Sequence, residues 1–429
     1  MRHYFAVFFL VILLVIPWFA WNYPNQIVFV ADKVGNISEM LVATVLNHKP
    51  KTADELKSRY SAASPTIFSS ITNNQHKRVR ILLVPGHEPS YGGAEFGSLK
   101  ERELVMELAN NLKGFIDQND KYQVFITRDG NSWNPTFANY FKDYWSDIAA
   151  WQKANKAEVR NLTKIDRTKT VVPEVIHNSV PNDVAMRLYG ISKWANENDI
   201  DIAIHIHLND DTRHGRSVSG EYSGFTIYVP EKQYANSTTT HLLADTIFKR
   251  LQKYSAVSDL PGESSGIVQD RDLIAIGAYN SMNAPSMLIE YGYLYEPQFV
   301  NENIRSVILK DLAYQTYLGL QDFFDAKNIT NVTGSADTFV LPHVWNKDLS
   351  EKNSSVSDIF ALQTALLLEG VYPPSGKSKN DCPRTGMIGV CTKAALSAFQ
   401  IKYGIDGENG KLGPKTIETM RQLYSVKAI

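Results

Sequence analysis

The sequence predicts an α/β protein: a three-layer sandwich with a mainly parallel sheet, preceded by an N-terminal transmembrane helix and followed by a small all-α domain. Strand-length apolar runs alternate with amphipathic helical patterns over residues 78–326, which is typical of a parallel sheet covered by helices. An uncharged apolar run opens the chain, and a repeated turn motif lies near its end. With 429 residues, the chain is long enough for two or three domains.

Residues 1–22 have the composition of a membrane-spanning helix. No charged residue occurs between Tyr4 and Trp21, which is about the shortest apolar stretch that crosses a bilayer. Arg2 precedes this stretch and places the amino end in the cytoplasm and the rest of the chain outside. We therefore expect an uncleaved signal anchor. A cleaved signal peptide is the alternative, although Pro17 to Trp21 offers a poor cleavage site, and a buried helix of a soluble protein is a third interpretation.

Residues 23–77 predict a stalk that holds the next domain off the membrane. Gln26 to Ala31 has the composition of a strand, and Ile37 to Leu46 has helical spacing. The stretch from Ser61 to Gln75 is rich in Ser, Thr and Asn, as linkers are.

Three apolar runs within residues 78–326 end in residues that bind metals or transfer protons. In chain order these residues are His87, the pair His205 and His207, and Glu290. In open α/β sheets, sites form where loops leave the carboxyl ends of the strands. Two imidazoles and a carboxylate with an open fourth position are the usual ligands of catalytic zinc. The spacing therefore predicts a zinc site at this edge of the sheet.

The motifs in this segment resemble those of zinc-dependent N-acetylmuramoyl-L-alanine amidases. The resemblance rests on Pro-Gly-His87 with the later Gly-Gly, Leu-Lys-Glu101, His-Ile-His207-Leu-Asn and Leu-Ile-Glu290-Tyr-Gly-Tyr-Leu, and it spans Arg78 to Ala326. It implies that His87, Glu101 and His207 bind Zn²⁺ and that Glu290 is the catalytic carboxylate. It also implies peptidoglycan as the substrate, cut between N-acetylmuramic acid and the first alanine of the stem peptide, and a bacterial protein acting outside the cytoplasm.

Each site residue also has a simpler interpretation. Glu101 follows Ser98 by three residues, so the two could form a capping box at a helix start. His205 and His207 lie on the same face of their strand, so both could bind the metal. The family has a small residue where His205 stands, which favours a role in supporting the ligands instead. Glu290 could pair structurally with a buried Lys or Arg.

The chain departs from the family pattern by an insertion over residues 130–183, which is rich in aromatic residues. It separates the strand that starts at Tyr122 from the Arg-bearing helix that starts at Met186. The insertion could pack its aromatic residues onto the domain as a surface decoration. We also consider that it forms a wall of the substrate groove or a regulatory lid.

The remaining elements of the domain follow the same alternation. We expect helices at Glu101 to Lys113, Asn139 to Val159, Thr240 to Tyr254 and Asn303 to Phe324, and a strand at Ser223 to Val229. Arg271 lies in the loop before the Glu290 strand. It is either a solvated loop charge or a contact for a substrate carboxylate.

Residues 327–355 predict a polar linker, and residues 356–425 a small helical domain. Two segments of this domain, starting at Gly386 and Gly410, share the pattern Gly-x-apolar-Gly-x-x-Thr-x-x-x-apolar, a turn that leads into a capped helix. The domain is similar to the peptidoglycan-binding domain found beside wall hydrolases, although Val390 replaces the usual proline. We expect Gln363 and Gln400 to serve packing.

Cys382 and Cys391 are the only cysteines of the sequence and flank one turn of this domain. Outside the cytoplasm they could form a disulfide. A metal site is the less favoured interpretation because no histidine is near them in the sequence.

The composition excludes one class of partner and leaves other functions open. A formal net charge of −1 argues against nucleic acid, which usually requires a basic face. The predicted partners are peptidoglycan and, through residues 1–22, a membrane; the sequence does not identify a protein activator. Another extracytoplasmic zinc amidohydrolase or peptidase, or a non-catalytic wall-binding scaffold, would be compatible with the same residues.

Overall fold

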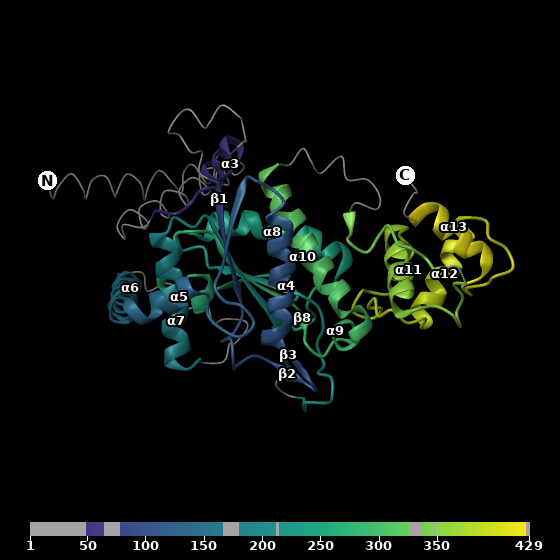
Figure 1. The fold of residues 1–429 in the computed structure, drawn as a ribbon, viewed down its shortest axis with the longest axis horizontal. Helices are drawn as coiled ribbons and strands as arrows, with labels where there is room; N and C mark the ends of the chain where they lie inside the picture. The colour runs from purple at the N-terminus through teal and green to yellow at the C-terminus, as the bar shows by residue number, and fades with distance from the viewer. Residues whose placement is uncertain are drawn as a thin grey trace, which may run out of the picture.

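The computed structural model describes residues 49–63, 78–165, 180–211, 214–325, 337–346 and 348–425. Its centre is a six-stranded sheet with the strand order β4-β1-β5-β8-β6-β7 (Figure 1). The strands are β1 (Val79–Pro85), β4 (Tyr122–Ile126), β5 (Ile202–Asn209), β6 (Thr226–Pro230), β7 (Ile267–Asp270) and β8 (Ser286–Tyr293). All neighbouring pairs are parallel except β6 and β8, which confirms the predicted mainly parallel sheet.

Helices cover both faces of the sheet. One layer contains α4 (Glu101–Ile116), α8 (Ser237–Tyr254), α9 (Pro297–Val300) and α10 (Glu302–Phe324). The opposite layer contains α5 (Pro135–Asp143), α6 (Trp145–Ile165) and α7 (Asn182–Glu197). The apolar strand residues divide accordingly, because side chains alternate along a strand: Ile81 and Ile204 pack in the first core and Leu82 and Ala203 in the second. Figure 1 shows the resulting three layers.

Short elements complete the α/β domain. The hairpin of β2 (Glu95–Phe96) and β3 (Leu99–Lys100) precedes α4, and two 3₁₀ turns, η1 (Ile274–Ile276) and η2 (Ala278–Asn280), precede β8.

The insertion packs its aromatic residues against α7. Phe137, Tyr140 and Phe141 of α5 are buried in the core that contains Trp194 of α7. The break between α5 and α6 falls at Tyr144, so the single helix expected over Asn139 to Val159 is two helices. These contacts agree with the interpretation that the insertion packs onto the domain as a surface decoration.

Part of the predicted stalk belongs to the α/β domain. Residues 53–62 form α3 (Ala53–Ala62), which begins with a capping box between Thr52 and Glu55. Leu56 and Tyr60 are buried in the main core, and Arg59 donates a hydrogen bond of 2.7 Å to the fully buried Asp201. The sequence interpretation of residues 23–77 as one stalk therefore does not hold for this segment.

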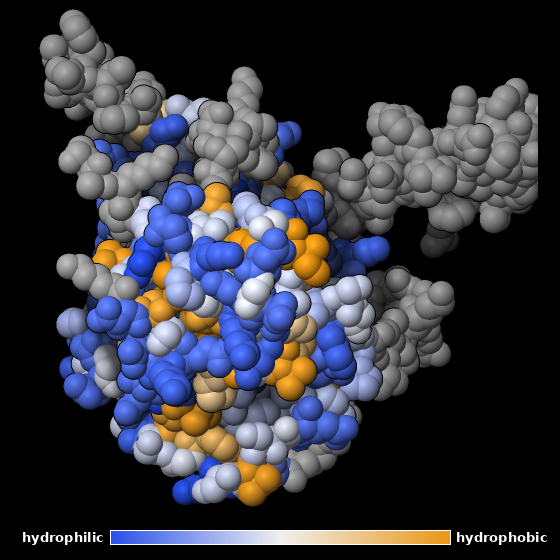
Figure 2. Space-filling view, turned by 90° about the vertical axis from the view of Figure 1, so that its right-hand side faces the viewer, coloured by the Kyte–Doolittle hydropathy of each residue, from blue (hydrophilic) through white to orange (hydrophobic). Residues whose placement is uncertain are grey.

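The C-terminal unit, residues 356–425, contains the helices α11 (Val356–Leu368), α12 (Val390–Lys402) and α13 (Pro414–Tyr424). Gln363 and Gln400 hold the two repeated turns through equivalent hydrogen bonds to backbone groups and to Thr392 and Thr416. Cys382 and Cys391 form a disulfide. Figure 2 shows this face of the molecule as largely hydrophilic, with separate apolar patches.

The chain before α11 is more than a polar linker. Val340, Leu341, Trp345 and Leu349 are buried and contact the main core. This segment was expected to be a linker because its apolar residues are too sparse to show a period.

The predicted signal anchor over residues 1–22 lies outside the described residues. Among the helices that the structure does describe, none combines the length and the apolar character needed to span a bilayer.

Candidate active site

The candidate site lies at the carboxyl edge of β1, β5 and β8. His87 follows β1 by two residues, and His207 and Glu290 are paired neighbours on β5 and β8, so their side chains share one face of the sheet. His87 has a φ of 68°, a left-handed conformation that non-glycine residues adopt rarely and often at functional sites. The strand order thus brings together three residues that are more than 80 positions apart.

Two glycines make room for the histidine rings. A Cβ atom on Gly86 would lie 2.4 Å from the ring of His207, and one on Gly93 would lie 2.8 Å from the ring of His87. Gly93 also has a φ of 86°, which favours glycine. The Gly-rich loop between β1 and α4 is therefore required by the close approach of these rings.

His87, Glu101 and His207 form one compact cluster. The Nε2 atom of His87 lies 2.7 Å from one carboxylate oxygen of Glu101, and Nδ1 of His207 lies 3.1 Å from the other. One donor atom from each residue can be chosen so that all three lie within 4.8 Å of one another. The three predicted ligands, which come from the loop after β1, from α4 and from β5, thus face a common point.

Glu101 does not form the capping box that was the alternative interpretation of this residue. It is the first residue of α4, whose N-cap is Lys100, and its carboxylate accepts hydrogen bonds from the backbone N–H groups of Ala94 (2.9 Å) and Leu208 (3.0 Å). Burial alone raises the pKa of Glu101, but the adjacent His87 and His207 outweigh it and hold the pKa well below its usual value. A buried carboxylate anion between two imidazoles is a favourable environment for a cation.

The cluster fits a zinc ion by its donor set and its geometry. Although His87 Nε2 approaches Glu101 closely, this buried nitrogen has no aligned hydrogen-bond partner among the described residues. A close approach without alignment is expected when two lone pairs point at a shared third atom. Two imidazole nitrogens and one carboxylate oxygen are ligands that catalytic zinc accepts while keeping a position open.

Glu290 lies beside this cluster as a partly buried carboxyl group. Its Oε2 atom has no hydrogen-bond partner in the described part of the chain. Burial, followed by the negative charges of Glu101 and Glu263, raises the pKa of Glu290 well above its usual value. A raised pKa makes a carboxylate a stronger proton acceptor, as a general base requires.

His205 lies on the same face of β5 but is not a member of the cluster among the described residues. It is buried, neither ring nitrogen has a hydrogen-bond partner there, and burial with the nearby His207 lowers its pKa to about 3. The structure therefore places a neutral imidazole next to the proposed ligands. Arg271, the candidate substrate contact, lies 3.5 Å from the carboxylate of its neighbour Asp272.

Arg128 and Glu88 fix the His87 loop through contacts that the sequence did not predict. The buried Arg128 donates hydrogen bonds to the carbonyl groups of Pro85 (3.3 Å) and Gly86 (2.5 Å). Glu88 accepts from Arg187 of α7 (2.7 Å) and from Trp133 of the insertion (3.1 Å). The insertion thus contacts the loop that carries a proposed ligand. The position of Arg128 at a strand end is the one available sequence signal.

Glu263 is a second buried carboxyl group at this edge that the sequence did not reveal. It accepts hydrogen bonds from Tyr228 (2.5 Å), Ser258 (2.5 Å), Asn209 (2.9 Å) and Tyr293 (3.2 Å). These residues come from β5, β6, β8 and the loop after α8, so Glu263 ties together the strands that hold His207 and Glu290.

One protein-family model matches the chain. The model of the N-acetylmuramoyl-L-alanine amidase family matches residues 81–322. No curated protein matches the sequence.

Several solved structures are similar to the chain. One contains the CwlD amidase from Clostridioides difficile in complex with the GerS lipoprotein, with 15% identity, a TM-score of 0.38, and coverage of 58% of this chain and 100% of that one. The amidase Ami1 from Mycobacterium smegmatis matches with 12% identity, the same coverage and a TM-score of 0.38. The catalytic domain of CwlV from Bacillus (Paenibacillus) polymyxa matches with 13% identity, a TM-score of 0.35, and coverage of 58% and 99%.

The family model covers more than half of the chain and includes all four candidate site residues. The protein therefore belongs to the N-acetylmuramoyl-L-alanine amidase family and is a peptidoglycan hydrolase.

Proposed function

We propose that the protein hydrolyses the amide between N-acetylmuramic acid and L-alanine of the stem peptide with a zinc ion bound by His87, Glu101 and His207. The observation that carries this proposal is the convergence of one donor atom from each of these residues within 4.8 Å, at the sheet edge that also holds Glu290. Zinc bound there supplies an activated water, with a pKa lowered to about 7, and an electrophile for the scissile carbonyl group.

Glu290 acts as the proton carrier in this mechanism. Its carboxylate accepts the proton of the attacking water as the new C–O bond forms. It then donates that proton to the alanine nitrogen as the C–N bond breaks, so the products are a free lactyl carboxylate and a peptide amine. The raised pKa of Glu290 suits both steps, because the group must be deprotonated first and protonated afterwards.

Other chain residues keep these groups in place. Glu101 is fixed by backbone N–H groups of Ala94 and Leu208, which leaves little freedom for its carboxylate to rotate. Arg128 fixes the backbone before His87, and Glu263 fixes Asn209 just after His207. Rigid support of this kind is what makes a catalytic site effective.

We also propose that the enzyme is anchored in the membrane and acts outside the cytoplasm. The apolar residues 1–22 anchor the protein in the membrane, and the catalytic domain acts outside the cytoplasm, where peptidoglycan lies. Residues 356–425 bind peptidoglycan, by their similarity in sequence pattern to the helical domains of wall hydrolases.

Mass spectrometry of digested sacculi tests the proposed reaction. We expect glycan fragments that lack peptide and intact stem peptides with a free alanine amine, and we expect a chelator to abolish both. Cleavage within the stem peptide would instead identify a peptidase. A zinc-loaded protein that binds sacculi and releases nothing would identify a scaffold.

A further inference from the structure

His87 is a proposed zinc ligand that is carried by a loop. Glu101 opens α4 and His207 lies on β5, whereas His87 follows the end of β1 by two residues. Its φ of 68° is a conformation that a non-glycine residue keeps only where the surrounding structure enforces it. A flexible ligand would lose conformational freedom when the ion binds, and that loss would weaken zinc binding. The affinity of the site therefore depends on what holds this loop.

Glu88, the next residue, is held at both carboxylate oxygens. Its side chain is buried although it lies in a loop. Oε1 accepts a hydrogen bond of 2.7 Å from Nε of Arg187, and Oε2 accepts one of 3.1 Å from Nε1 of Trp133. The two donors come from different elements, α7 and the insertion. A carboxylate bound at both oxygens in this way cannot rotate freely, so it restrains the backbone beside His87.

The insertion holds Trp133 by its own packing. The ring of Trp133 meets the ring of Phe141 of α5 edge to face, with 5.1 Å between the ring centroids. The backbone of Trp133 also pairs with Arg128, just after β4, in an antiparallel bridge. Phe141 is buried in the core that the insertion shares with α7, and Figure 1 shows α5 beside α7. Such packing suits a permanent support and not a lid, which must open.

Helix α7 holds the same loop at a second point. Arg187 also donates a hydrogen bond to the hydroxyl group of Tyr91 (3.1 Å), and that hydroxyl group donates one to Asp183 (3.1 Å). Arg187 and Asp183 form an ion pair one turn apart on α7. The loop is therefore attached to α7 at Glu88 and at Tyr91, and Arg187 is fixed in the direction in which it meets Glu88.

Glu88 acts through His87 and not on the ion itself. The cluster of possible metal ligands among the described residues consists of His87, Glu101 and His207, and Glu88 is not a member. Both oxygens of Glu88 are occupied by the donors from α7 and the insertion. Its contribution to the site is therefore the position of its neighbour.

We propose that Glu88 is a positioning residue for His87, and that the insertion tightens zinc binding through the hydrogen bond from Trp133 to Glu88. This inference rests on the proposed function, because it requires that His87 binds zinc. It gives residues 130–183 a role that neither a surface decoration nor a lid would have. Mutation of residues that support metal ligands typically changes the metal affinity by about 10–100-fold. One hydrogen bond to the neighbour of a ligand belongs at the lower end of that range.

Competition with a chromophoric chelator measures the Kd for zinc of the full chain. Trp133→Phe removes the N–H donor and keeps an aromatic ring against Phe141, so we expect the Kd to rise about tenfold. Zinc in large excess should restore the kcat of this variant, because the support acts on binding. Trp145→Phe is the matched control, since Trp145 is an exposed tryptophan of the same insertion, and it should leave the Kd unchanged. Equal Kd values for the two variants would overturn the proposal, as would a loss of kcat that excess zinc does not repair.

A double-mutant cycle shows whether Trp133 acts through Glu88. Glu88→Ala removes the acceptor and should raise the Kd for zinc about tenfold or more. In that background Trp133→Phe should have no further effect, because the hydrogen bond that it would remove is already gone. A second rise of the same size would contradict the proposed connection.

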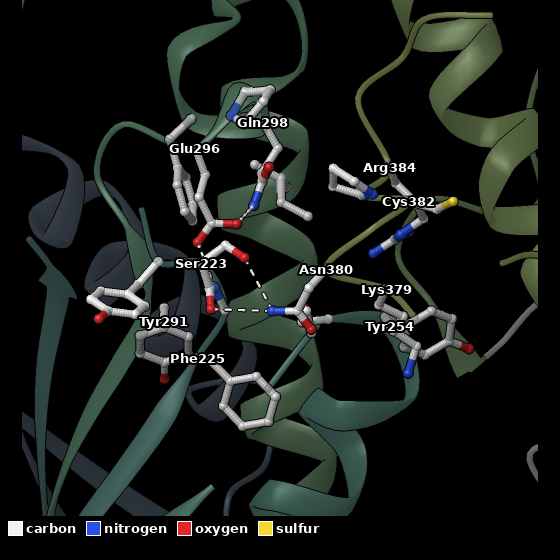
Figure 3. A pocket seen from close by; sticks show the side chains of 18 of the residues that line it. Ser223, Phe225, Tyr254, Tyr291, Glu296, Gln298, Lys379, Asn380, Cys382 and Arg384 are labelled. Carbon is white, nitrogen blue, oxygen red and sulfur yellow. Dashed lines mark hydrogen bonds between the residues drawn. The ribbon is translucent and has the colours of Figure 1, made fainter. Parts of the chain in front are cut away.

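The C-terminal unit supplies a control for a general loosening of the structure. Asn380 donates a hydrogen bond to the carbonyl group of Ser223 (3.3 Å; Figure 3) and another to that of Val257 (3.2 Å), which attach this unit to the α/β domain. Asn380→Ala removes these bonds and should leave the Kd for zinc unchanged. A Kd raised as much as in Trp133→Phe would show that any loss of packing has this effect, which would contradict a specific role of the insertion.

The zinc measurement separates this inference from the proposed function, because it needs no turnover. An unaltered chain that binds no zinc contradicts both. Zinc binding without cleavage of the amide contradicts the proposed reaction alone. An unaltered chain that binds zinc as tightly as Trp133→Phe contradicts the role of the insertion alone.

Discussion

Two carboxyl groups at the catalytic edge have opposite surroundings. Glu263 accepts hydrogen bonds from four side chains, whereas one oxygen of Glu290 has no hydrogen-bond partner among the described residues. The charge of Glu263 is one of the causes that raise the pKa of Glu290. The structure thus satisfies one carboxyl group with hydrogen bonds and leaves an oxygen of the other available for proton transfer.

Glu263→Gln should shift the pH dependence of the reaction. Glu290 must be deprotonated to accept a proton, so kcat/KM falls as the pH drops below its pKa. Removing the negative charge of Glu263 makes deprotonation easier and lowers that pKa, so we expect the acid limb of the pH profile of kcat/KM to move to lower pH. Glu418→Gln, a change at an exposed carboxylate far along the chain, should leave the profile in place. An acid limb at the same pH in both variants would contradict the coupling.

The sequence predicted His87, His207 and Glu290 because each closes or ends an apolar run, a local signal. The role of Glu101 as a metal ligand was predicted only from the resemblance to the amidase family. Its spacing from Ser98 alone was equally compatible with a capping box. Glu263 could not be predicted, because its partners come from four separate elements and share no pattern in the sequence. Contacts of this kind are fixed by the topology of the sheet.

Among the elements, α3 shows how local signals mislead about domain boundaries. The helix has two buried residues, Leu56 and Tyr60, spaced by one turn, which is too few to give a clear apolar period. The capping box of α3 is visible in the sequence, but the residues around it are mostly polar, so it does not indicate a helix packed on a core. The helix is nevertheless held by Arg59 and Lys51, which pair with Asp199 and Asp201 beyond α7.

Leu56→Ala should therefore destabilise the catalytic domain. The side chain is 1% exposed, and its removal leaves a cavity in the main core, which costs about 2–4 kcal/mol in the free energy of unfolding. Chemical denaturation measures this change. Ser61→Ala, at an exposed position of the same helix, should change it by less than about 0.5 kcal/mol. A similar small effect for Leu56→Ala would show that the helix is a detachable stalk after all.

At the scale of the whole molecule, the alternation of strands and helices and the C-terminal repeat predicted the architecture, and the described residues bear out the layers and the parallel sheet. The sequence could not predict that the C-terminal unit docks on the catalytic domain. That contact is made by polar residues, among them Arg384, Asn380 and Asp311. From the sequence alone, polar residues are expected at a solvated surface.

Arg384→Met should weaken the docking of the two parts. Arg384 is buried, donates a hydrogen bond to Thr364 (2.7 Å) and lies over the ring of Phe360. Its loss leaves Asp311 without a cationic partner among the residues that the structure describes. Breaking a buried pair on one side costs about 3 kcal/mol, measurable by urea unfolding of the full chain. Lys411→Met, an exposed change in the same unit, serves as the control. A loss below about 1 kcal/mol would mean that the two parts are stabilised independently.

The central claim is that three residues bind one zinc ion while a fourth moves the proton. The most direct test measures zinc stoichiometry and wall hydrolysis on the same samples of the unaltered chain, Glu290→Ala and His87→Ala. We predict one zinc per chain for the first two, with most of the activity lost in Glu290→Ala, and the loss of both zinc and activity in His87→Ala. Full turnover in Glu290→Ala, or a full zinc content in His87→Ala, would contradict the account.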